Sequence, residues 1–389
     1  MNFILGIGVI FIFGLMFGKV AEKVKTPAIT AYLVLGILIG PFVLNILPMN
    51  IIKISGTISQ IALSLIAFSI GQNFSKATFR NVGKQVLWIS IMEAVGAWLI
   101  TVIALLCFKV PGYLALIFGA IAAASAPAAI IMVVREYKAR GQFVDVLMGV
   151  VALDDAWGLI IFSISLAIAK AMYAHLSTSM FNVVLGSLLE IGKAFILGGL
   201  LGFMLSRAGR ALKNQTELLI CTLGFIFVTT GLALHFHASV LLSCMFLAAV
   251  VVNLNNESFK FFDVLGHVDW PIYLVFFVLA GASLEIDLLM QIGVIGLVYL
   301  IFRVVGKFIG TYLGAVIAKS DDDIKKYLSL GLFPQAGVAL GMALIAKEQF
   351  PQAGSIIFTT VAATTVVYEI IGPYFVKIAL HKTNQIHSN

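Results

Sequence analysis

Residues 146–170 read VLMGVVALDDAWGLIIFSISLAIAK, an apolar run about as long as a membrane is thick, with two adjacent carboxylates, Asp154 and Asp155, inside it. An ionised carboxylate at the centre of a membrane helix costs roughly 2.5–3.5 kcal/mol on insertion scales, and neighbouring carboxylates also repel each other. Acidic residues at such positions face protein or water and are functional by default. We therefore interpret the pair as an ion-binding site; the alternative is two acids at a helix end in a water-filled vestibule.

The composition indicates a protein made largely of membrane-spanning helices. Of its 389 residues, 61% are hydrophobic and 11% are charged, whereas a soluble domain averages roughly 25% charged residues. The net charge of +7 does not indicate nucleic-acid binding, because the basic residues are dispersed along short loops. Three cysteines lie in apolar runs without a CxxC spacing, so neither a disulfide framework nor a soft-metal site is expected.

Apolar runs separated by short charged loops predict thirteen transmembrane helices and an all-α polytopic fold. The first run follows no basic segment and precedes no small-residue cleavage site, so we expect a span and not a signal peptide. The expected spans are residues 3–18, 28–46, 55–71, 85–107, 112–134, 146–170, 181–205, 216–235, 238–252, 269–283, 291–317, 326–346 and 353–380.

The basic residues predict how the chain is oriented. Eighteen of its 25 lysine and arginine residues lie in the odd-numbered loops or at the C-terminal end, four lie in the even-numbered loops, and three lie within spans. Loops rich in lysine and arginine stay in the cytoplasm. We therefore expect a plasma-membrane protein with its N-terminus outside and its C-terminus in the cytoplasm.

The chain repeats itself at a fixed spacing. Gly71 precedes Gly96 by 25 residues, and Gly281 precedes Gly306 by the same number. The common spacing pairs spans 3 to 6 with spans 10 to 13, seven spans apart. Because seven is an odd number, paired spans cross the membrane in opposite directions, and one half is inverted relative to the other. Inverted repeats are typical of secondary transporters, whose site lies near the midplane. We predict a first repeat in residues 1–171, a linker span in residues 172–215 and a second repeat in residues 216–389.

Prolines interrupt one span of each repeat at corresponding positions. Span 5 contains AAASAPAAI, with Ser125 and Pro127, and span 12 contains GLFPQAGVALG, with Pro334, Gln335 and Gly337. Proline lacks an N–H and clashes with the preceding turn, so each helix should break and leave carbonyl oxygens that suit a hard cation. One such span would be an ordinary kink, whereas a symmetric pair beside two acids predicts a transporter's binding site.

Span 11 carries Arg303 and Lys307 on one helix face, beside glycines at four-residue spacing. Because small residues allow close helix approach, we expect Lys307 to pair with Asp154 and not to extend to the membrane surface. Adjacent helix positions differ by about 100° in direction, so Asp154 and Asp155 cannot both face the lysine, and the spacing does not decide between them. Glu93 precedes Arg303 by 210 residues, the offset of the repeat, and we predict a structural ion pair between them.

The Asp154–Asp155 pair, the two broken-helix motifs, Lys307 and the thirteen-span inverted repeat together resemble bacterial cation/proton antiporters of the NapA type, which include spore-germination sodium/proton antiporters. Residues 26–41, TPAITAYLVLGILIGP, are similar to the family's second-span signature. The resemblance implies an NhaA/NapA-like fold of two inverted six-helix repeats. Spans 3–6 and 10–13 would form a core with crossed broken helices, and the other spans a panel that dimerises.

The resemblance also implies roles and partners. Asp155 would bind the cation, and Asp154 would pair with Lys307 until a proton or ion arrives; this combination is associated with electrogenic exchange of two protons for one Na⁺. The implied partners are Na⁺, Li⁺ or K⁺, protons, the lipid bilayer and a second copy of the chain, with no cofactor beyond the transported ions. Ser125 and Pro127 stand where many sodium/proton exchangers carry a Thr-Asp pair, a departure from the family's pattern.

Four other functions share some of these features. A K⁺/H⁺ antiporter differs in ion preference, and a sodium-coupled organic-anion symporter of the same architecture needs a larger cavity and no buried lysine. A channel also uses acids and broken helices, but its flux is not coupled to protons. An intramembrane aspartyl protease needs two acids that face each other from separate helices, and we identify no such pair. We therefore expect a transporter and not an enzyme.

Overall fold

The computed structural model describes residues 3–24, 28–41, 43–47, 51, 55–174, 180–212, 214–255, 257–266, 268–282, 293–335 and 337–385. Within these ranges every regular element is a helix, as the sequence predicts. Thr26 and Pro27, which begin the second-span signature, lie outside the described residues.

Each expected span coincides with one helix or with two helices separated by a short break. In the expected division of the chain, whose bounds stay a prediction, the first repeat contains α1 (Phe3–Val24), α2 (Ala28–Ile39), α4 (Ser55–Gly71), η1 (Gln72–Phe74), α5 (Lys76–Cys107), α6 (Gly112–Ala122), α7 (Pro127–Glu136) and α8 (Gln142–Ala174). The linker is α9 (Met180–Gly209). The second repeat contains α10 (Gln215–His235), α11 (Val240–Leu254), α12 (Phe259–Leu265), α13 (Asp269–Ala282), α14 (Gly293–Ile317), α15 (Asp322–Gly331), α16 (Gly337–Gln349) and α17 (Gly354–Lys382).

Length and composition identify the helices that can cross a membrane unaided. Seven of the described helices meet this test, and the bent pair α12–α13 would make eight. The remaining expected spans are short helices or the halves of broken ones. The short helix α12 is an element that the hydropathy pattern did not predict.

The predicted repeat is visible in the helix ends. After the breaks, α7 begins at Pro127 and α16 begins at Gly337, an offset of 210 residues. Lys109 and Lys319 have the same offset, and both adopt left-handed backbone conformations, with φ of 60° and 55°, in the turns after α5 and α14. Both halves therefore build the same local structure at equivalent positions.

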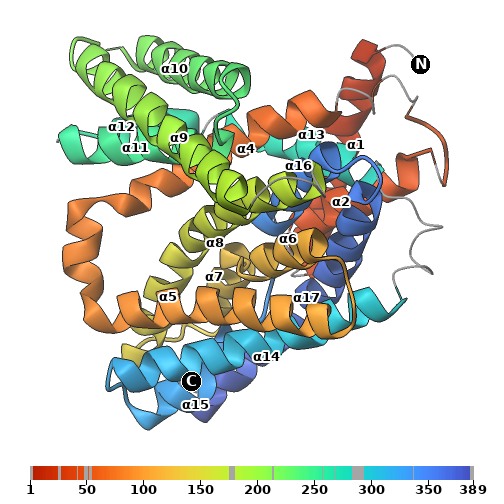
Figure 1. Cartoon of the computed structure of the whole chain (residues 1–389), viewed down its shortest axis with the longest axis vertical. Coiled ribbons are helices and arrows are strands. Elements are labelled where there is room, and N and C mark those ends of the chain that lie inside the picture. The colour runs from red at the N-terminus through yellow and green to blue at the C-terminus, as the bar shows by residue number, and fades with distance from the viewer. Residues whose placement is uncertain are drawn as a thin grey trace.

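Helices α5 and α14 are the most extensively packed pair among the described helices and run alongside each other in Figure 1. A Cβ at Gly96 on α5 would lie 2.6 Å from the Cα of Gly310 on α14, and a Cβ at Gly310 would lie 2.3 Å from the Met92 carbonyl oxygen. The helices are antiparallel, because positions further along α14 meet earlier positions on α5. The equivalent glycines Gly96 and Gly306 contact each other and mark the crossing of the repeats.

Two further helix pairs connect the halves symmetrically. α4 packs on α11, where a Cβ at Gly71 would lie 2.4 Å from the Met245 carbonyl oxygen. α13 packs on α2, where a Cβ at Gly281 would lie 2.2 Å from the Leu33 carbonyl oxygen. We expected α4 and α13 in the core but α2 and α11 in the panel, so this packing crosses the expected boundary. The division into core and panel stays a prediction.

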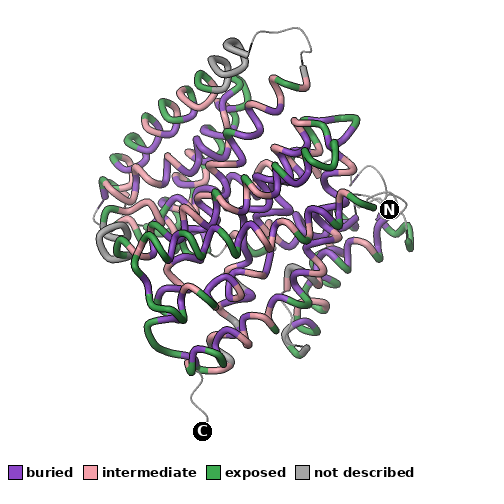
Figure 2. The backbone as a smooth tube through the Cα atoms, turned by 60° about the horizontal axis from the view of Figure 1, so that its bottom comes forward, coloured by how far each residue is buried: buried purple, intermediate pink, exposed green. Residues whose placement is uncertain are grey.

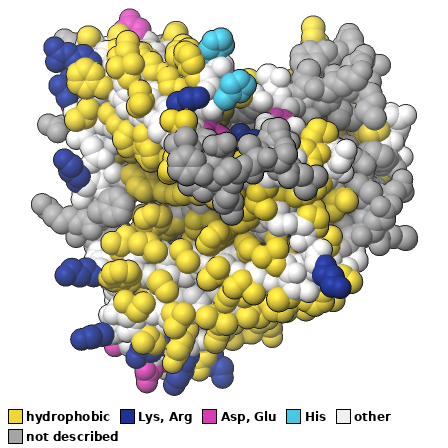
Figure 3. Space-filling view, viewed as in Figure 1, with side chains coloured by type: hydrophobic (Ala, Val, Ile, Leu, Met, Phe, Trp, Pro, Cys, Tyr) yellow, Lys and Arg dark blue, Asp and Glu magenta, His cyan; other side chains and the backbone are white. Residues whose placement is uncertain are grey.

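The buried residues lie where the helices meet, and the outer helices expose apolar side chains. Figure 2 shows buried backbone through the interior and exposed stretches toward the outside. The described part of the face in Figure 3 is largely hydrophobic, with most of its lysine and arginine side chains near the left and lower edges. An exposed apolar surface of this kind suits contact with lipid.

Gly310→Ala should destabilise the protein, because the added methyl group would meet backbone atoms of α5 that cannot rotate away. We expect a cost of about 1–3 kcal/mol, as for other overpacked interiors. The measurement is the midpoint of thermal unfolding in detergent, followed by tryptophan fluorescence. Gly224→Ala on α10 is the matched control, since a Cβ there meets nothing within 4 Å. Equal midpoints for the two variants would contradict the close crossing.

Candidate functional site

The breaks of the two interrupted helices meet in the interior of the protein. The first break precedes α7, which begins at Pro127, and the second precedes α16, which begins at Gly337. The backbone N–H of Ala126 in the first break donates to the Pro334 carbonyl oxygen in the second at 3.0 Å. The prolines therefore mark two broken helices, as predicted, and the breaks are joined directly.

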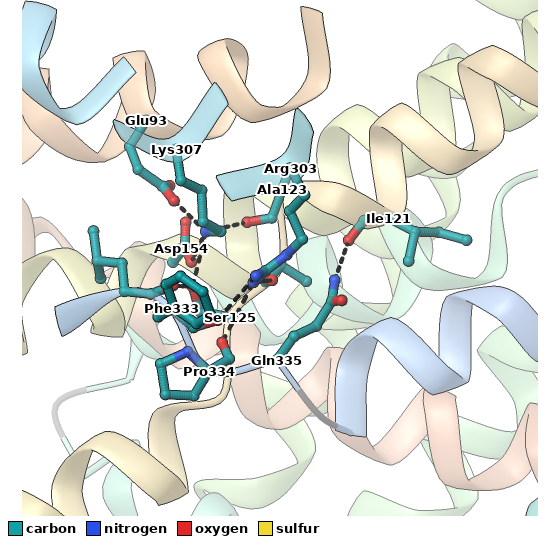
Figure 4. A network of polar contacts seen from close by, with 12 residues as sticks. Glu93, Ile121, Ala123, Ser125, Asp154, Arg303, Lys307, Phe333, Pro334 and Gln335 are labelled. Carbon is teal, nitrogen blue, oxygen red and sulfur yellow. Dashed lines mark hydrogen bonds and ion pairs between the residues drawn. The ribbon is translucent and has the colours of Figure 1, made fainter. Parts of the chain in front are cut away.

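Arg303 on α14 binds carbonyl oxygens that the breaks release. Its guanidinium group donates to the carbonyl oxygens of Phe333 and Ala124 at 2.9 Å each and to that of Pro334 at 3.3 Å (Figure 4). Its Cζ atom lies 4.4 Å from the centroid of the Tyr368 ring. A planar group with several fixed donors suits this task, so one buried cation satisfies backbone groups of both broken helices.

The predicted ion pair between Glu93 and Arg303 is not formed, because Glu93 contacts Lys307 instead. The prediction assumed that equivalent residues of the two repeats meet. Antiparallel helices bring equivalent positions together only at their crossing, which here is at Gly96 and Gly306. Three residues earlier on each helix, the two positions have moved in opposite directions by about 4.5 Å each. Arg303 therefore reaches the helix breaks and not the acid.

Lys307 lies at the centre of the site, and its ammonium group makes four polar contacts (Figure 4). It pairs with the Glu93 carboxylate and with Asp154, whose Oδ2 atom lies 3.2 Å from Nζ. It also donates to the Ser125 hydroxyl at 2.9 Å and to the Ala123 carbonyl oxygen at 3.0 Å. Only 2% of this side chain is exposed. The structure thus shows the predicted contact with Asp154 and not a lysine that extends to the membrane surface.

Asp155 lies beside this cluster, and its carboxylate meets the backbone of Ser125. Among the described residues, Oδ1 of Asp155 has no hydrogen-bond partner, and the same is true of Oδ1 of Asp154 and Oε2 of Glu93. Buried polar atoms are normally paired, so these oxygens are candidates for binding a proton or a bare cation. The structure directs Asp154 to the lysine, as predicted, although helix spacing alone did not decide between the two acids.

Gln335 connects the second break to the first. Its Nε2 atom donates to the Ile121 carbonyl oxygen at 2.9 Å, and its side chain also hydrogen-bonds the hydroxyl of Tyr299 (Figure 4). The glutamine is fully buried. The residues predicted from the broken-helix motifs thus lie in or at the ends of the two breaks: Ser125, Pro127, Pro334, Gln335 and Gly337.

The charges of the site are divided between the repeats. The first repeat supplies Glu93, Asp154 and Asp155, and the second supplies Arg303 and Lys307. With all five ionised, the group carries one net negative charge, which one proton or one monovalent cation neutralises. In the described part of the chain, no group of three or more His, Cys, Asp or Glu side chains is arranged to hold a metal ion.

We predicted no role in ion binding for Glu93, Tyr299 or Tyr368. For Glu93 a signal was present, because an acid within an apolar span is functional by default, but we assigned it to a structural pair. The tyrosines carry no such signal, since aromatic residues are common in apolar spans. Their roles follow from contacts with Gln335 and Arg303, which sequence spacing does not reveal.

Known proteins resemble this chain in sequence. Residues 7–382 match the family described as "Sodium/hydrogen exchanger, transmembrane". Over 202 residues the chain is 28% identical to Na(+)/H(+) antiporter 1 of Methanocaldococcus jannaschii. The match covers 50% of this chain and 45% of that relative, so this chain spans about half of the relative's length. Over 311 residues it is 24% identical to the probable Na(+)/H(+) antiporter 2 of the same organism, covering 74% and 72%.

The fold is similar to solved structures of a membrane protein. The structure of the sodium proton antiporter MjNhaP1 from Methanocaldococcus jannaschii at pH 8 gives a TM-score of 0.76 at 20% identity, covering 98% of this chain and 100% of that one. An electron-microscopy map of the same antiporter gives a TM-score of 0.71 at 18% identity, with both chains fully covered. The predicted all-helical fold is confirmed by these likenesses.

Lys307→Met should destabilise the protein by about 3–5 kcal/mol, because it leaves Glu93 and Asp154 buried without their cation. Adding Glu93→Gln should restore part of the loss, since one uncompensated charge fewer stays buried. Thermal unfolding in detergent at neutral pH measures both effects.

Lys325→Met is the matched control for this pair of variants. Lys325 forms a more exposed ion pair with Asp322, at 3.1 Å, and exposed pairs contribute at most about 1 kcal/mol. If Lys307→Met were as stable as this control, the buried ion pairs would not be stabilising the fold.

Proposed function

This chain belongs to the sodium/hydrogen exchanger family, and from that premise we propose that it exchanges a monovalent cation for protons across the membrane. It is a membrane transporter and not an enzyme. The observation that carries the proposal is Lys307 held between two buried carboxylates, with Asp155 beside it at the junction of two broken helices. Na⁺ is the cation we expect, because both curated relatives are named for it.

Competition for the same carboxylates would couple the two ions. A buried ionised carboxylate is costly, so Asp154 and Asp155 favour an occupant that neutralises them, either protons or the cation. Carbonyl oxygens at the helix breaks are further ligands for a hard cation. The site must release its protons before it binds the cation, and it must bind protons again before it releases the cation. Protons and the cation therefore cross the membrane in opposite directions.

We assign to Glu93 the task of keeping Lys307 charged while Asp154 is occupied. An ammonium group has three N–H donors, but four acceptors surround Lys307. The lysine can therefore release Asp154 and still use all three donors. Protons then bind to Asp154 and Asp155, which supports electrogenic exchange of two protons for one cation.

The space beside Arg303 and Lys307 suits an ion better than an organic substrate. The cavity that these two residues line with Phe333, and that neither Asp154 nor Asp155 lines, has a volume of about 20 Å³, which is roughly enough for one water-sized species. An organic-anion symporter would need a pocket of about 300 Å³ or more. A K⁺/H⁺ antiporter needs no more space than a sodium exchanger and is the alternative function.

Alternating access is the transport mechanism we propose. Binding of the cation or of protons would change the charge of a core built around α8, α14 and the broken helices. The core would then rock against a panel through which two copies of the chain associate. The basic loops support a plasma-membrane protein with an outer N-terminus and a cytoplasmic C-terminus. The Asp154–Asp155 pair and Lys307 support a place among NapA-type antiporters, and a role in spore germination is one hypothesis within that group.

Asp155→Asn should abolish cation-driven proton movement, because it removes the carboxylate that does not bind Lys307. Purified protein would be reconstituted into vesicles with an internal pH dye, and Na⁺, Li⁺, K⁺ and choline compared under imposed membrane potentials. Asp145→Asn is the matched control, since Asp145 is an exposed acid in the first turn of the same helix and should not affect the rate.

Each outcome of this assay has a definite meaning. Cation-specific proton movement that responds to the potential and is lost in Asp155→Asn supports electrogenic antiport. Proton movement that does not respond to the potential supports antiport but contradicts the coupling of two protons to one cation. If wild-type protein shows no cation-dependent proton movement, the antiporter proposal is wrong, and a symporter or channel becomes the better description.

Glu93→Gln should move half-maximal exchange to lower pH, by about one unit. The substitution removes a negative charge beside Asp154, so protons bind less tightly to the carboxylates that are left. The pH dependence of Na⁺-driven exchange measures this shift, with Asp145→Asn again as the control. A slower rate with an unchanged pH profile would show that Glu93 only supports the fold.

A further inference from the structure

A second, much larger cavity lies away from the charged site, between α8, α9 and α11. The three helices contact one another; in Figure 1, α9 and α11 lie in the upper left part and α8 nearer the centre. The cavity has a volume of about 570 Å³, within the range of roughly 300–1,000 Å³ typical of ligand sites. Its walls are apolar and include Ile160, Ile164, Phe195, Leu242 and Met245.

The cavity opens toward the outside of the helix bundle. Ile164 on α8 and Phe195 on α9 line it and are 38% and 43% exposed, and Leu254 at the end of α11 is also exposed. In a membrane protein, exposed apolar side chains of outer helices contact lipid. The cavity is therefore accessible to a molecule that arrives from the bilayer.

One end of the cavity is polar and is built from three segments of the chain. Asn253 lines this end, and its side chain accepts from the backbone N–H of Lys76 at 2.8 Å and donates to the carbonyl oxygens of Phe74 at 2.8 Å and Ala249 at 2.7 Å. Its hydrogen-bonding capacity is thus used within the protein. The amide fixes the start of α5 against the end of α11 and leaves recognition to neighbouring side chains.

Two exposed cations flank this polar end. Lys76 lines the cavity, and Arg210 donates to the carbonyl oxygen of Leu254, another lining residue. No ion pair with a described carboxylate forms at either side chain. Both belong to odd-numbered loops, on the side of the membrane where we expect the cytoplasm and where anionic lipids are concentrated.

An apolar slot with two cations at one end is complementary to an anionic amphiphile. We propose that this cavity binds one acyl chain of an anionic phospholipid, whose headgroup lies between Lys76 and Arg210. The bound chain would contact α8, the helix that carries Asp154 and Asp155, and the neighbouring α9 and α11. The site is separate from the ion-binding centre and does not depend on which ion the protein transports.

Native mass spectrometry of the purified protein tests the proposal with phosphatidylglycerol and phosphatidylcholine of identical acyl chains. Wild-type protein should retain phosphatidylglycerol preferentially. Lys76→Gln combined with Arg210→Gln should weaken its binding by about tenfold or more, because each basic residue near an anionic surface contributes about 1 kcal/mol. Lys109→Gln combined with Lys319→Gln is the matched control, since it removes two cations from loops elsewhere in the fold and should bind as wild type.

A second variant tests the cavity itself. Ala249→Phe would fill the space between α9 and α11 and should reduce binding of both lipids, whereas Leu200→Phe, at an exposed position on α9, should not. The charge variant changes only exposed side chains, so the test does not depend on whether Ala249→Phe folds.

Three results would overturn the proposal. Equal retention of the two phospholipids by wild-type protein would reject headgroup recognition, and wild-type binding by the charge variant would place the lipid elsewhere. Retention of oleate but not of phosphatidylglycerol would reject a phospholipid as the occupant. Binding is measured without transport, so a protein that binds phosphatidylglycerol but exchanges no ions would refute only the proposed function.

Discussion

Five charged side chains are buried together in the interior of a membrane protein, and they can persist there only if they compensate one another. Lys307 meets this requirement by contacting Glu93 and Asp154 at once. The contact exists because α5 and α14 approach so closely that only glycine fits at Gly96 and Gly310. Close backbone packing is thus the condition for charge compensation, since a wider crossing would leave the ammonium group short of the acid on α5.

The helix breaks depend on the same arrangement. A broken helix leaves carbonyl oxygens without their usual donors, and such groups are costly when buried. Arg303 and Gln335 supply donors to both breaks, and the backbone N–H of Ala126 supplies one more. These donors lower the cost of burying the broken backbone beside the charged site.

Much of this arrangement could be predicted from the sequence. Hydropathy gave the spans, prolines marked both breaks, and the mid-span position of Lys307 pointed to a buried partner. The partner of Glu93 could not be predicted, because the offset of a repeat relates positions by symmetry but does not measure their separation. Equivalent residues meet only where the helices cross, and the crossing point depends on which glycines are in contact. The apolar cavity was equally hidden, since its walls come from helices that are far apart in the chain.

The division of charges between the repeats has a consequence for how the protein is made. The acids of the site lie on α5 and α8, which are synthesised before α14 delivers the two bases. The first half must therefore enter the bilayer with three carboxyl groups that have no counter-ion, and these are cheapest to carry when protonated. Ionisation of the acids then becomes a late step that follows docking of the second half. Neither half carries the counter-charges for its own buried groups, so each half depends on the other, although the two share local structure at equivalent positions.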